Sequence, residues 1–325
     1  MNQKFLEYID CLRGKKLAVA VSGGIDSICL LHWCKLANLD ITCLHVNHGL
    51  RAAADIETQY VCDLCKKLNV PCKIFYWTDA KPNTGLENAA RDARYKMMTD
   101  FCKQNDIYAL MVAHQADDQI ETFLMNLGRG SGLYGLAAMR RETMRDGVKI
   151  VRPLLDVSRA ELRSWLDDNN IKYFIDEMNS DPHYTRVKIR QNRYLLNEKL
   201  GITDTRILLA IQNLGHLRDR LERDVEHLVQ SVIGDDGRAI FSSAFLFDQG
   251  VDIRLKFIGT LVQTIGGDKY PPRLNSLENA LFKLQTDCKF TLGHCVLRRL
   301  NDKILVAKEG GKTTFRKRKN EKKHI

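Results

Sequence analysis

The chain has 325 residues, of which 44% are hydrophobic and 28% charged, and a formal net charge of +10. This length allows two domains and a substantial core, and the composition is that of a globular protein. No apolar run is long enough to span a bilayer, and the first residues lack the apolar core and cleavage site of a signal peptide. We therefore expect a cytoplasmic protein with no membrane partner, whose ten cysteines stay reduced.

The first predicted strand ends in a glycine turn that opens a helix. The apolar run 17–21 is followed by Ser22-Gly23-Gly24-Ile25-Asp26-Ser27 and then by the apolar residues 28–31. Such a turn lets backbone N–H groups face a phosphate at a helix N-terminus, and its glycines leave room for a polyanion. No lysine follows the glycines, so the pattern is not the G-x-x-x-x-G-K-[ST] nucleotide loop. An ordinary tight strand-to-helix turn is the alternative interpretation.

Strand patterns alternate with helix patterns through the first half of the chain. Strands are predicted near 17–21, 41–46, 72–76, 108–113 and 148–151. Helices are predicted near 26–37, 55–69, 86–104, 117–127 and 158–169. This alternation favours an α/β fold with a doubly wound, mainly parallel sheet. The glycine turn, the run His45-Val46-Asn47-His48 and the pair Ala113-His114 all follow strands, so they should meet at one edge of the sheet.

An acidic segment opens the helix predicted after His114. Asp118 and Glu121 are three residues apart and share one face, while apolar residues cover the other. Carboxylates placed there can hold Mg²⁺ together with ATP phosphates, or can grip an ammonium group and later remove its proton. Acids in a first helical turn also serve as caps, and the local pattern alone favours capping.

Basic segments allow a structural and a nucleic-acid interpretation. Glu87, Arg91 and Arg94 form one stripe of a helix, which suits a surface ion pair or an arginine pair aimed at phosphate. The segment 184–193 interleaves basic and apolar residues, as a solvated helix or a nucleic-acid rail does. From 312 to 325, seven basic residues and one acid give a charge of 7 − 1 = +6, typical of an arm that touches nucleic acid or of a solubilising tail.

Cys62 and Cys65 are the one cysteine pair at metal or redox spacing. No second close pair completes four ligands, and the segment has a helical pattern. Buried thiols that pack as small hydrophobes are the favoured interpretation.

After about residue 200 the pattern changes to that of a second, mostly helical domain. Apolar residues repeat at three and four positions over 214–228, and two β-like runs at 289–299 and 303–307 predict a small hairpin. The expected domains are a catalytic domain over 1–198, a helical domain over 199–311 and a disordered basic tail over 312–325.

Taken together, these segments resemble the bacterial tRNA(Ile)-lysidine synthetases, a family of PP-loop ATP pyrophosphatases. The matching segments are SGGIDS (22–27), HVNHGLR (45–51), ENAARDARY (87–95), AHQADDQIETFLMNLGRGSGLYGL (113–136), RPLL (152–155) and DEMNSDPHYTRVKIR (176–190). SGGxDS is shared by many PP-loop enzymes, whereas the H-x-x-D-D-Q-x-E-T…R-G block is specific. Met178 stands where the family has serine and Val187 where it has asparagine, which would alter a tRNA contact made there.

The resemblance implies an ATP-dependent ligase that joins L-lysine to C2 of the wobble cytidine in the CAU anticodon of an isoleucine tRNA. ATP first adenylates O2 of that cytosine and releases pyrophosphate, and the lysine ε-amine then displaces AMP. The implied ATP-binding residues are Ser22, Gly23, Gly24, Ile25, Asp26, Ser27, His48 and His114. The implied Mg²⁺ ligands are Asp26 and Asp118.

Asp118 and Glu121 are the implied lysine-binding pair, with Glu121 as the general base. With Asp26, Arg186 and Arg190 complete the expected catalytic set, because an arginine can stabilise charge on the α-phosphate. The expected tRNA-binding residues are Arg51, Arg91, Arg94, Arg129, Arg193, Arg316, Lys317 and Arg318. The basic tail is expected to replace in part a further domain of longer family members. The sequence leaves open whether the chain forms a homodimer.

Three other functions are alternatives. A PP-loop tRNA thiolase would carry several paired cysteines for an iron–sulfur cluster. A small-molecule amidating ligase of the GMP or NAD synthetase type would not need the basic tail. A non-catalytic RNA-binding protein would not need an intact glycine turn and acidic block, although a fold alone never establishes a function.

Overall fold

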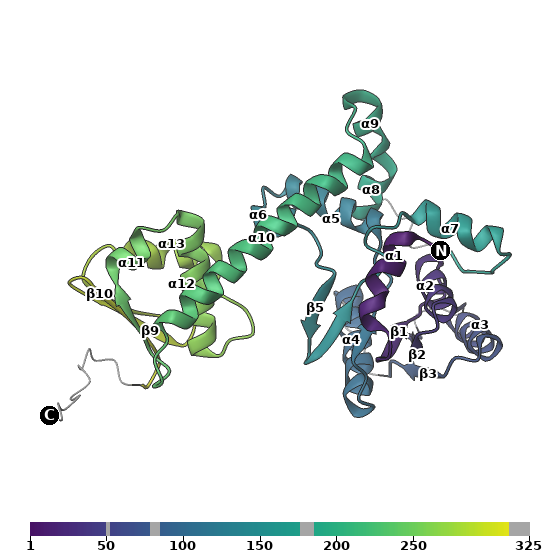
Figure 1. Ribbon diagram of the computed structural model, residues 1–325, viewed down its shortest axis with the longest axis horizontal. Coiled ribbons are helices and arrows are strands. Elements are labelled where there is room, and N and C mark those ends of the chain that lie inside the picture. The colour runs from purple at the N-terminus through teal and green to yellow at the C-terminus, as the bar shows by residue number, and fades with distance from the viewer. Residues whose placement is uncertain (50–52, 79–84, 176–184, 312–325) are drawn as a thin grey trace. The chain divides into compact units, whose positions relative to one another are not determined.

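A six-stranded sheet organises the first part of the chain (Figure 1). Its strands are β1 (Lys16–Ala20), β2 (Asp40–Asn47), β3 (Cys72–Tyr76), β4 (Ala109–Met111), β5 (Glu142–Arg145) and β6 (Val148–Val151). They stand in the order β3-β2-β1-β4-β6-β5, and all but β5 are parallel. The chain runs outward from β1 to β3 and restarts at β4 on the other side of β1. The doubly wound, mainly parallel sheet predicted from the sequence is therefore confirmed, with its switch point between β1 and β4.

The computed structural model describes residues 1–49, 53–78, 85–175 and 185–311. The chain divides into two compact units, Met1–Gly215 and His216–Ile325. The boundary along the sequence falls within the helix α10 (Asp204–Val232). The predicted division into functional domains at residues 198 and 311 stays a prediction. Across the described ranges, none of the helices is both long and apolar enough to cross a membrane.

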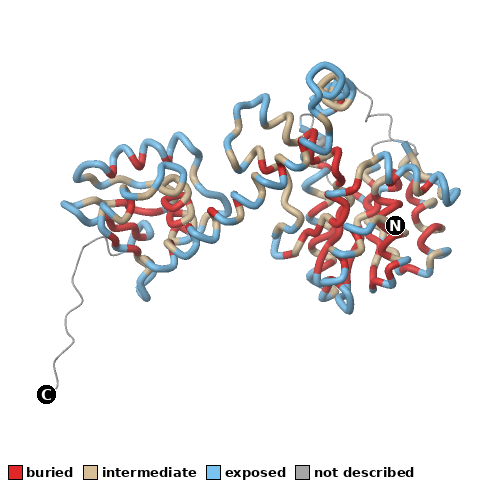
Figure 2. Tube along the Cα trace, turned by 45° about the horizontal axis from the view of Figure 1, so that its top comes forward, coloured by how far each residue is buried: buried red, intermediate tan, exposed pale blue. Residues whose placement is uncertain are grey.

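Helices cover both faces of the first unit's sheet. The helices that precede α10 in this unit are α1 (Gln3–Ile9), the short 3₁₀ helix η1 (Asp10–Leu12), α2 (Ile25–Leu36), α3 (Ala53–Leu68), α4 (Leu86–Gln104), α5 (Ala116–Gly128), α6 (Leu133–Leu136), α7 (Arg159–Asp168), α8 (Thr185–Asn192) and α9 (Tyr194–Leu200). Leu17 and Val19 of β1 share a core with α1, α2, α3 and α7, whereas Ala18 points to the other face and packs with α4. Figure 2 shows this burial as red along the strands and α2.

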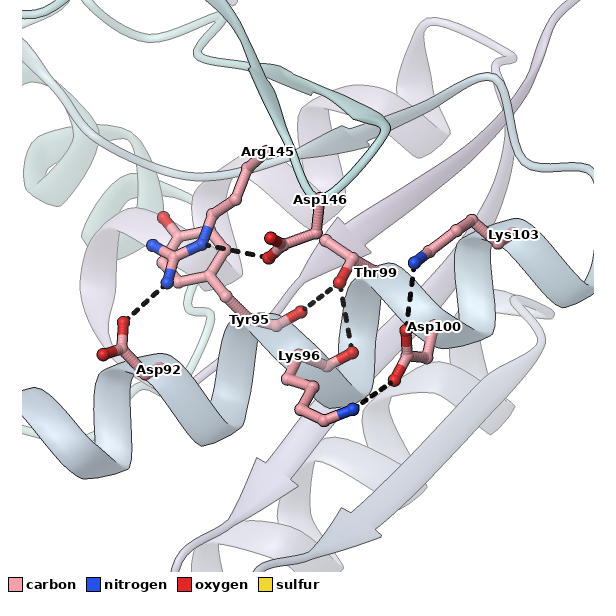
Figure 3. A network of polar contacts seen from close by, with 8 residues as sticks. All are labelled: Asp92, Tyr95, Lys96, Thr99, Asp100, Lys103, Arg145 and Asp146. Carbon is pink, nitrogen blue, oxygen red and sulfur yellow. Dashed lines mark hydrogen bonds and ion pairs between the residues drawn. The ribbon is translucent and has the colours of Figure 1, made fainter. Parts of the chain in front are cut away.

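The edge strand β5 was not predicted. It pairs antiparallel with β6 through a tight turn at Asp146 and Gly147, both at positive φ. Polar residues on a half-exposed edge give no apolar run, so the sequence carries no strand signal there. Arg145 ties the hairpin to α4, because it pairs with Asp92 at 2.6 Å and lies over the Tyr95 ring at 4.0 Å (Figure 3).

The second unit contains more β-structure than the sequence predicts. After α10 it comprises β7 (Ala239–Ser242), α11 (Ser243–Phe247), α12 (Val251–Gly266), α13 (Leu274–Lys283), β8 (Cys288–Leu292), β9 (Cys295–Leu300) and β10 (Lys303–Lys308). The strands form an antiparallel sheet in the order β7-β10-β9-β8. The predicted run 289–299 is two strands, because Gly293 and His294 both take positive φ and reverse the chain.

Candidate active site

The carboxyl ends of β1, β2 and β4 meet at a cavity of about 510 Å³ in the first unit. Ser22, His48 and His114, one from each strand end, line it. The prediction that the polar residues after these strands meet at one edge is confirmed. The cavity lies at the switch point between β1 and β4, where open α/β sheets bind ligands.

The turn between β1 and α2 is closed by serine hydroxyls and by a distant aromatic ring. The Ser22 N–H donates to Ser27 Oγ at 3.1 Å, and Ser27 Oγ donates to the Gly24 carbonyl at 3.0 Å. Gly23 has a φ of +93°, and a Cβ added there would lie 3.5 Å from the Phe174 ring. The Phe174 N–H donates to the Gly23 carbonyl at 2.9 Å. Backbone conformation therefore favours glycine at this position, and Phe174, which also lines the cavity, packs against the turn.

Asp26 and Asp118 both line the cavity and influence each other's charge. Burial raises the pKa of Asp26 to about 6; Arg159 opposes the rise, and the carboxylates of Asp118 and Asp117 add to it. Burial also raises the pKa of Asp118. Asp26 Oδ1 is buried and has no hydrogen-bond partner among the described residues. Crowded carboxyl groups with an unused oxygen fit a divalent cation or another positively charged ligand.

Asp118 also caps α5. Its Oδ2 accepts a hydrogen bond from the Gln115 N–H at 3.0 Å, while the Gln115 side chain accepts one from the Asp117 N–H at 2.5 Å. The capping interpretation is confirmed for the acids in the first turn, but the N-cap itself is Gln115 and not one of the two aspartates. Capping and cavity lining coexist, because the two oxygens of one carboxylate can serve different partners.

Glu121 lies on the next turn of α5 and has no exposed surface. The Arg190 Nε donates to Glu121 Oε1 at 2.7 Å, and this bond raises the pKa of Arg190. Glu121 Oε2 is buried with no partner in the part of the chain that the structure describes. Arg190 lines the cavity, so Glu121 lies behind it and keeps one acceptor oxygen unused. A buried carboxylate oxygen without a hydrogen-bond donor costs free energy of folding, unless a bound ligand supplies the donor.

Arginines gather around Tyr95 and His114. Guanidinium carbons lie 5.2, 5.8 and 4.0 Å from the Tyr95 ring centroid in Arg91, Arg94 and Arg145. Burial, together with the charges of neighbouring arginines, lowers the pKa of His114 to about 3. His114 is therefore neutral at physiological pH, and the arginines supply the positive charge that attracts an anionic substrate.

The other predicted cationic residues differ in their surroundings. Arg129 and Arg186 are exposed. Arg193 is ion-paired to Asp117 and, at 3.3 Å, to Asp204. Outside the described residues lie Arg51, Arg316, Lys317 and Arg318.

Of the two departures from the family motif, the structure describes Val187 but not Met178. Val187 is 6% exposed on α8, a helix that packs against α5, so an apolar residue suits this place. Met178 lies outside the described ranges.

Sequence reasoning missed a polar network that joins β2 to α3. His45 and Thr58 Oγ1 are 3.0 Å apart, and the Asn47 amide donates to Asp55 at 2.8 Å and to Thr58 at 3.1 Å. Glu57 of the same helix lines the cavity and is buried. The available signal was a His-x-Asn pattern at a strand end followed by buried polar residues in the first turns of a helix.

Comparisons with known proteins agree with this site. Residues 1–197 match the family model described as the PP-loop domain. A tRNA(Ile)-lysidine synthase from Wolbachia sp. subsp. Brugia malayi (strain TRS) is 33% identical over 312 residues, which cover 91% of this chain and 71% of that protein. Another from Ruegeria pomeroyi is 34% identical over 288 residues, covering 87% of this chain and 68% of that protein.

A solved structure shows the same fold. The U34-tRNA thiolase NcsA from Methanococcus maripaludis, determined with its 4Fe-4S cluster, has a TM-score of 0.56 at 18% identity, over 66% of this chain and 77% of its own. The relatives of higher identity extend through both units of the chain. The chain therefore belongs to the PP-loop domain family and, within it, to the tRNA(Ile)-lysidine synthases.

Proposed function

We propose that this chain uses ATP to join L-lysine to C2 of the wobble cytidine in the CAU anticodon of an isoleucine tRNA. ATP adenylates O2 of the cytosine and releases pyrophosphate, and the lysine ε-amine then displaces AMP. The observation that carries this proposal is the shared cavity of the glycine turn and the acidic start of α5. Family membership supports the tRNA substrate.

The glycine turn suits the leaving pyrophosphate. Backbone N–H groups at the start of α2 and the hydroxyls of Ser22 and Ser27 are donors for phosphate oxygens, and the helix adds partial positive charge. His48 and His114 line the same cavity and complete the proposed nucleotide site.

Asp26 and Asp118 are the proposed Mg²⁺ ligands. The unused Oδ1 of Asp26 and the mutual crowding of the two carboxyl groups fit such an ion. When bound, Mg²⁺ would neutralise phosphate charge on ATP.

The arginines suit the nucleic acid and the α-phosphate. Arg91 and Arg94 belong to the group around Tyr95 and are proposed to contact substrate phosphates. Arg190 lines the cavity, and with Arg186 it is proposed to stabilise charge on the α-phosphate during attack. The target base must leave the anticodon stack, which costs little in a single-stranded loop.

Glu121 suits a substrate that arrives as an ammonium ion. Its Oε1 holds Arg190, and its buried Oε2 is unused in the described structure, so a lysine ammonium would supply the missing donor. Because Glu121 has no exposed surface, access requires Arg190 to move aside. Glu121 then takes the proton that the amine must lose before attack. Asp118 lies close enough to Glu121 for the charge of Glu121 to raise its pKa, and it is proposed to help hold the amine.

Replacing Gly23 with alanine is expected to lower the rate of lysine incorporation more than tenfold, because the turn would lose the φ of +93° that its phosphate-facing backbone needs. Gly14→Ala is the matched control, since Gly14 has a φ of +70° and open space around an added Cβ. Both variants carry a similar backbone cost of about 1 kcal/mol. Equal losses of activity in the two variants would show that the turn has no special role.

Deleting residues 312–325 is expected to weaken tRNA binding and to flatten its salt dependence. The segment carries a charge of +6, and each phosphate contact that it makes would release counterions. Filter binding over a range of salt concentrations measures both quantities. An unchanged affinity and slope would exclude the tail from the tRNA interface.

The reaction itself is tested by incubating the protein with ATP, radiolabelled lysine and tRNA that has a CAU anticodon. Label is expected in the RNA only when ATP is present. The matched control is the same tRNA with uridine at the wobble position, which should remain unlabelled. Transfer of label to neither RNA would reject the proposed function.

A further inference from the structure

Cysteines that are far apart in the sequence meet in one cluster beneath α3. The Sγ atoms of Cys43, Cys65 and Cys72 all lie within 4.8 Å of one another. Cys62 lies one turn before Cys65 on α3, on the same face of the helix. Cys65 of this pair thus has two neighbouring sulfurs that the spacing of the cysteines did not reveal.

The fold fixes this cluster through the path of the backbone. Cys43 of β2 and Cys72 of β3 are register partners on parallel strands, so their side chains share one face of the sheet. The Val70 N–H donates to the Cys65 carbonyl at 2.9 Å, and the Cys43 N–H donates to the Pro71 carbonyl at 2.8 Å. The end of α3 and the start of β3 are therefore held beside β2 by main-chain bonds.

The spacing of the sulfurs suits a single tetrahedral ion. Zinc–sulfur bonds of about 2.3 Å place tetrahedral ligand sulfurs about 3.8 Å apart. A cubane iron–sulfur cluster bonds each cysteine to a different iron and spreads the sulfurs more widely. A disulfide would join only two of the sulfurs and leave the others as buried thiols. The three sulfurs within 4.8 Å therefore favour one ion.

The cluster offers one kind of donor atom to a cation. The Sγ atoms of Cys43, Cys65 and Cys72 converge within 4.8 Å of one another, and Cys62 precedes Cys65 by three residues on the same face of α3. The thiolate is the form of cysteine that binds metals.

We propose that Cys43, Cys65 and Cys72, with Cys62 as the fourth ligand, bind one Zn²⁺ ion in a structural site. Binding releases the thiol protons of the ligands. The ion would tie α3 and β3 to β2, the strand whose end brings His45 and Asn47 to the active-site cavity. This site is separate from the Mg²⁺ and ATP chemistry, so its test is independent of the proposed function.

Cobalt is the probe, because Co²⁺ bound by thiolates gives a sulfur-to-metal charge-transfer band. The reduced, metal-free full chain is titrated with Co²⁺ and then with Zn²⁺. We expect the band to saturate at one Co²⁺ per chain and to disappear with one Zn²⁺. The variant Cys72→Ala is expected to lose stoichiometric binding, whereas Cys102→Ala, which removes a fully buried thiol of α4, is expected to keep it.

Alkylation of the wild type keeps the test decisive if Cys72→Ala does not fold. Zn²⁺ is expected to slow modification of the half-buried Cys62 and Cys72 and to leave the exposed Cys11 unchanged. No band in the reduced wild type at one equivalent would overturn the proposal. Equal binding by folded Cys72→Ala and Cys102→Ala would also overturn it. So would alkylation of Cys62 and Cys72 at a rate that does not change when Zn²⁺ is added.

Discussion

Glu121→Gln is expected to reduce lysine incorporation by about 10²- to 10⁴-fold, the usual contribution of a general base. The glutamine side chain keeps the size of the glutamate, but it cannot accept the proton that the lysine amine must lose. Adenylation of the tRNA should continue, because the glycine turn and Asp26 are intact. The two steps are distinguished by measuring the formation of adenylated tRNA and the transfer of radiolabelled lysine separately.

The control for this variant addresses stability. Loss of the carboxylate leaves Arg190, whose side chain is 31% exposed, without the negative charge that it pairs with at 2.7 Å, so some destabilisation is expected. Glu198→Gln, an exposed change on α9, should leave both steps and the unfolding midpoint unchanged. Full activity of a folded Glu121→Gln protein would remove Glu121 from the mechanism.

Asp26→Asn is expected to slow adenylation strongly and, at the same time, to stabilise the ligand-free protein. The activity should fall about 10²-fold or more, because a charged group at the phosphates is lost. The pKa of Asp26 is raised from 3.8 to about 6 by burial, so its native site disfavours the carboxylate. This shift corresponds to up to about 3 kcal/mol at neutral pH, which the neutral asparagine relieves.

The sign of this effect can be checked against pH. A group whose pKa is raised on folding contributes stability below its unfolded pKa and loses that contribution as pH rises through the folded value. The wild type should therefore lose stability relative to Asp26→Asn as pH rises from 3.8 to about 6. Urea unfolding at both ends of this range measures the difference. Asp40→Asn, an exposed change at the other end of β2, should show no such divergence. A less stable Asp26→Asn protein at pH 7 would contradict the account.

Local sequence determined most of the first unit. The acidic helix predicted over 117–127 is α5, Ala116–Gly128, because its apolar stripe and its first-turn acids agree. The strands β1 to β4 are short apolar runs bounded by turns, which is the pattern of a buried parallel sheet. The edge strand β5 could not be predicted, because contacts of Arg145 with α4 hold it in place. These contacts are between distant parts of the sequence, so no local pattern indicates them.

The candidate site shows the same limit. The motif turn and the strand-end histidines are local features, so their meeting could be predicted once a parallel sheet was recognised. Phe174 reaches Gly23 from beyond α7, and its segment has no signal for that contact. The cluster of Cys43, Cys65 and Cys72 likewise depends on strand register, which the spacing of cysteines does not encode.

The central claim is that the glycine turn and the acids of α5 form one site that activates a tRNA base with AMP. ATP radiolabelled at the α-phosphate, mixed with the protein and CAU-anticodon tRNA in the absence of lysine, tests it most directly. Label is expected on the tRNA, with pyrophosphate released, and is expected to leave as AMP when lysine is added. Release of ADP, or tRNA that never acquires the label, would contradict it.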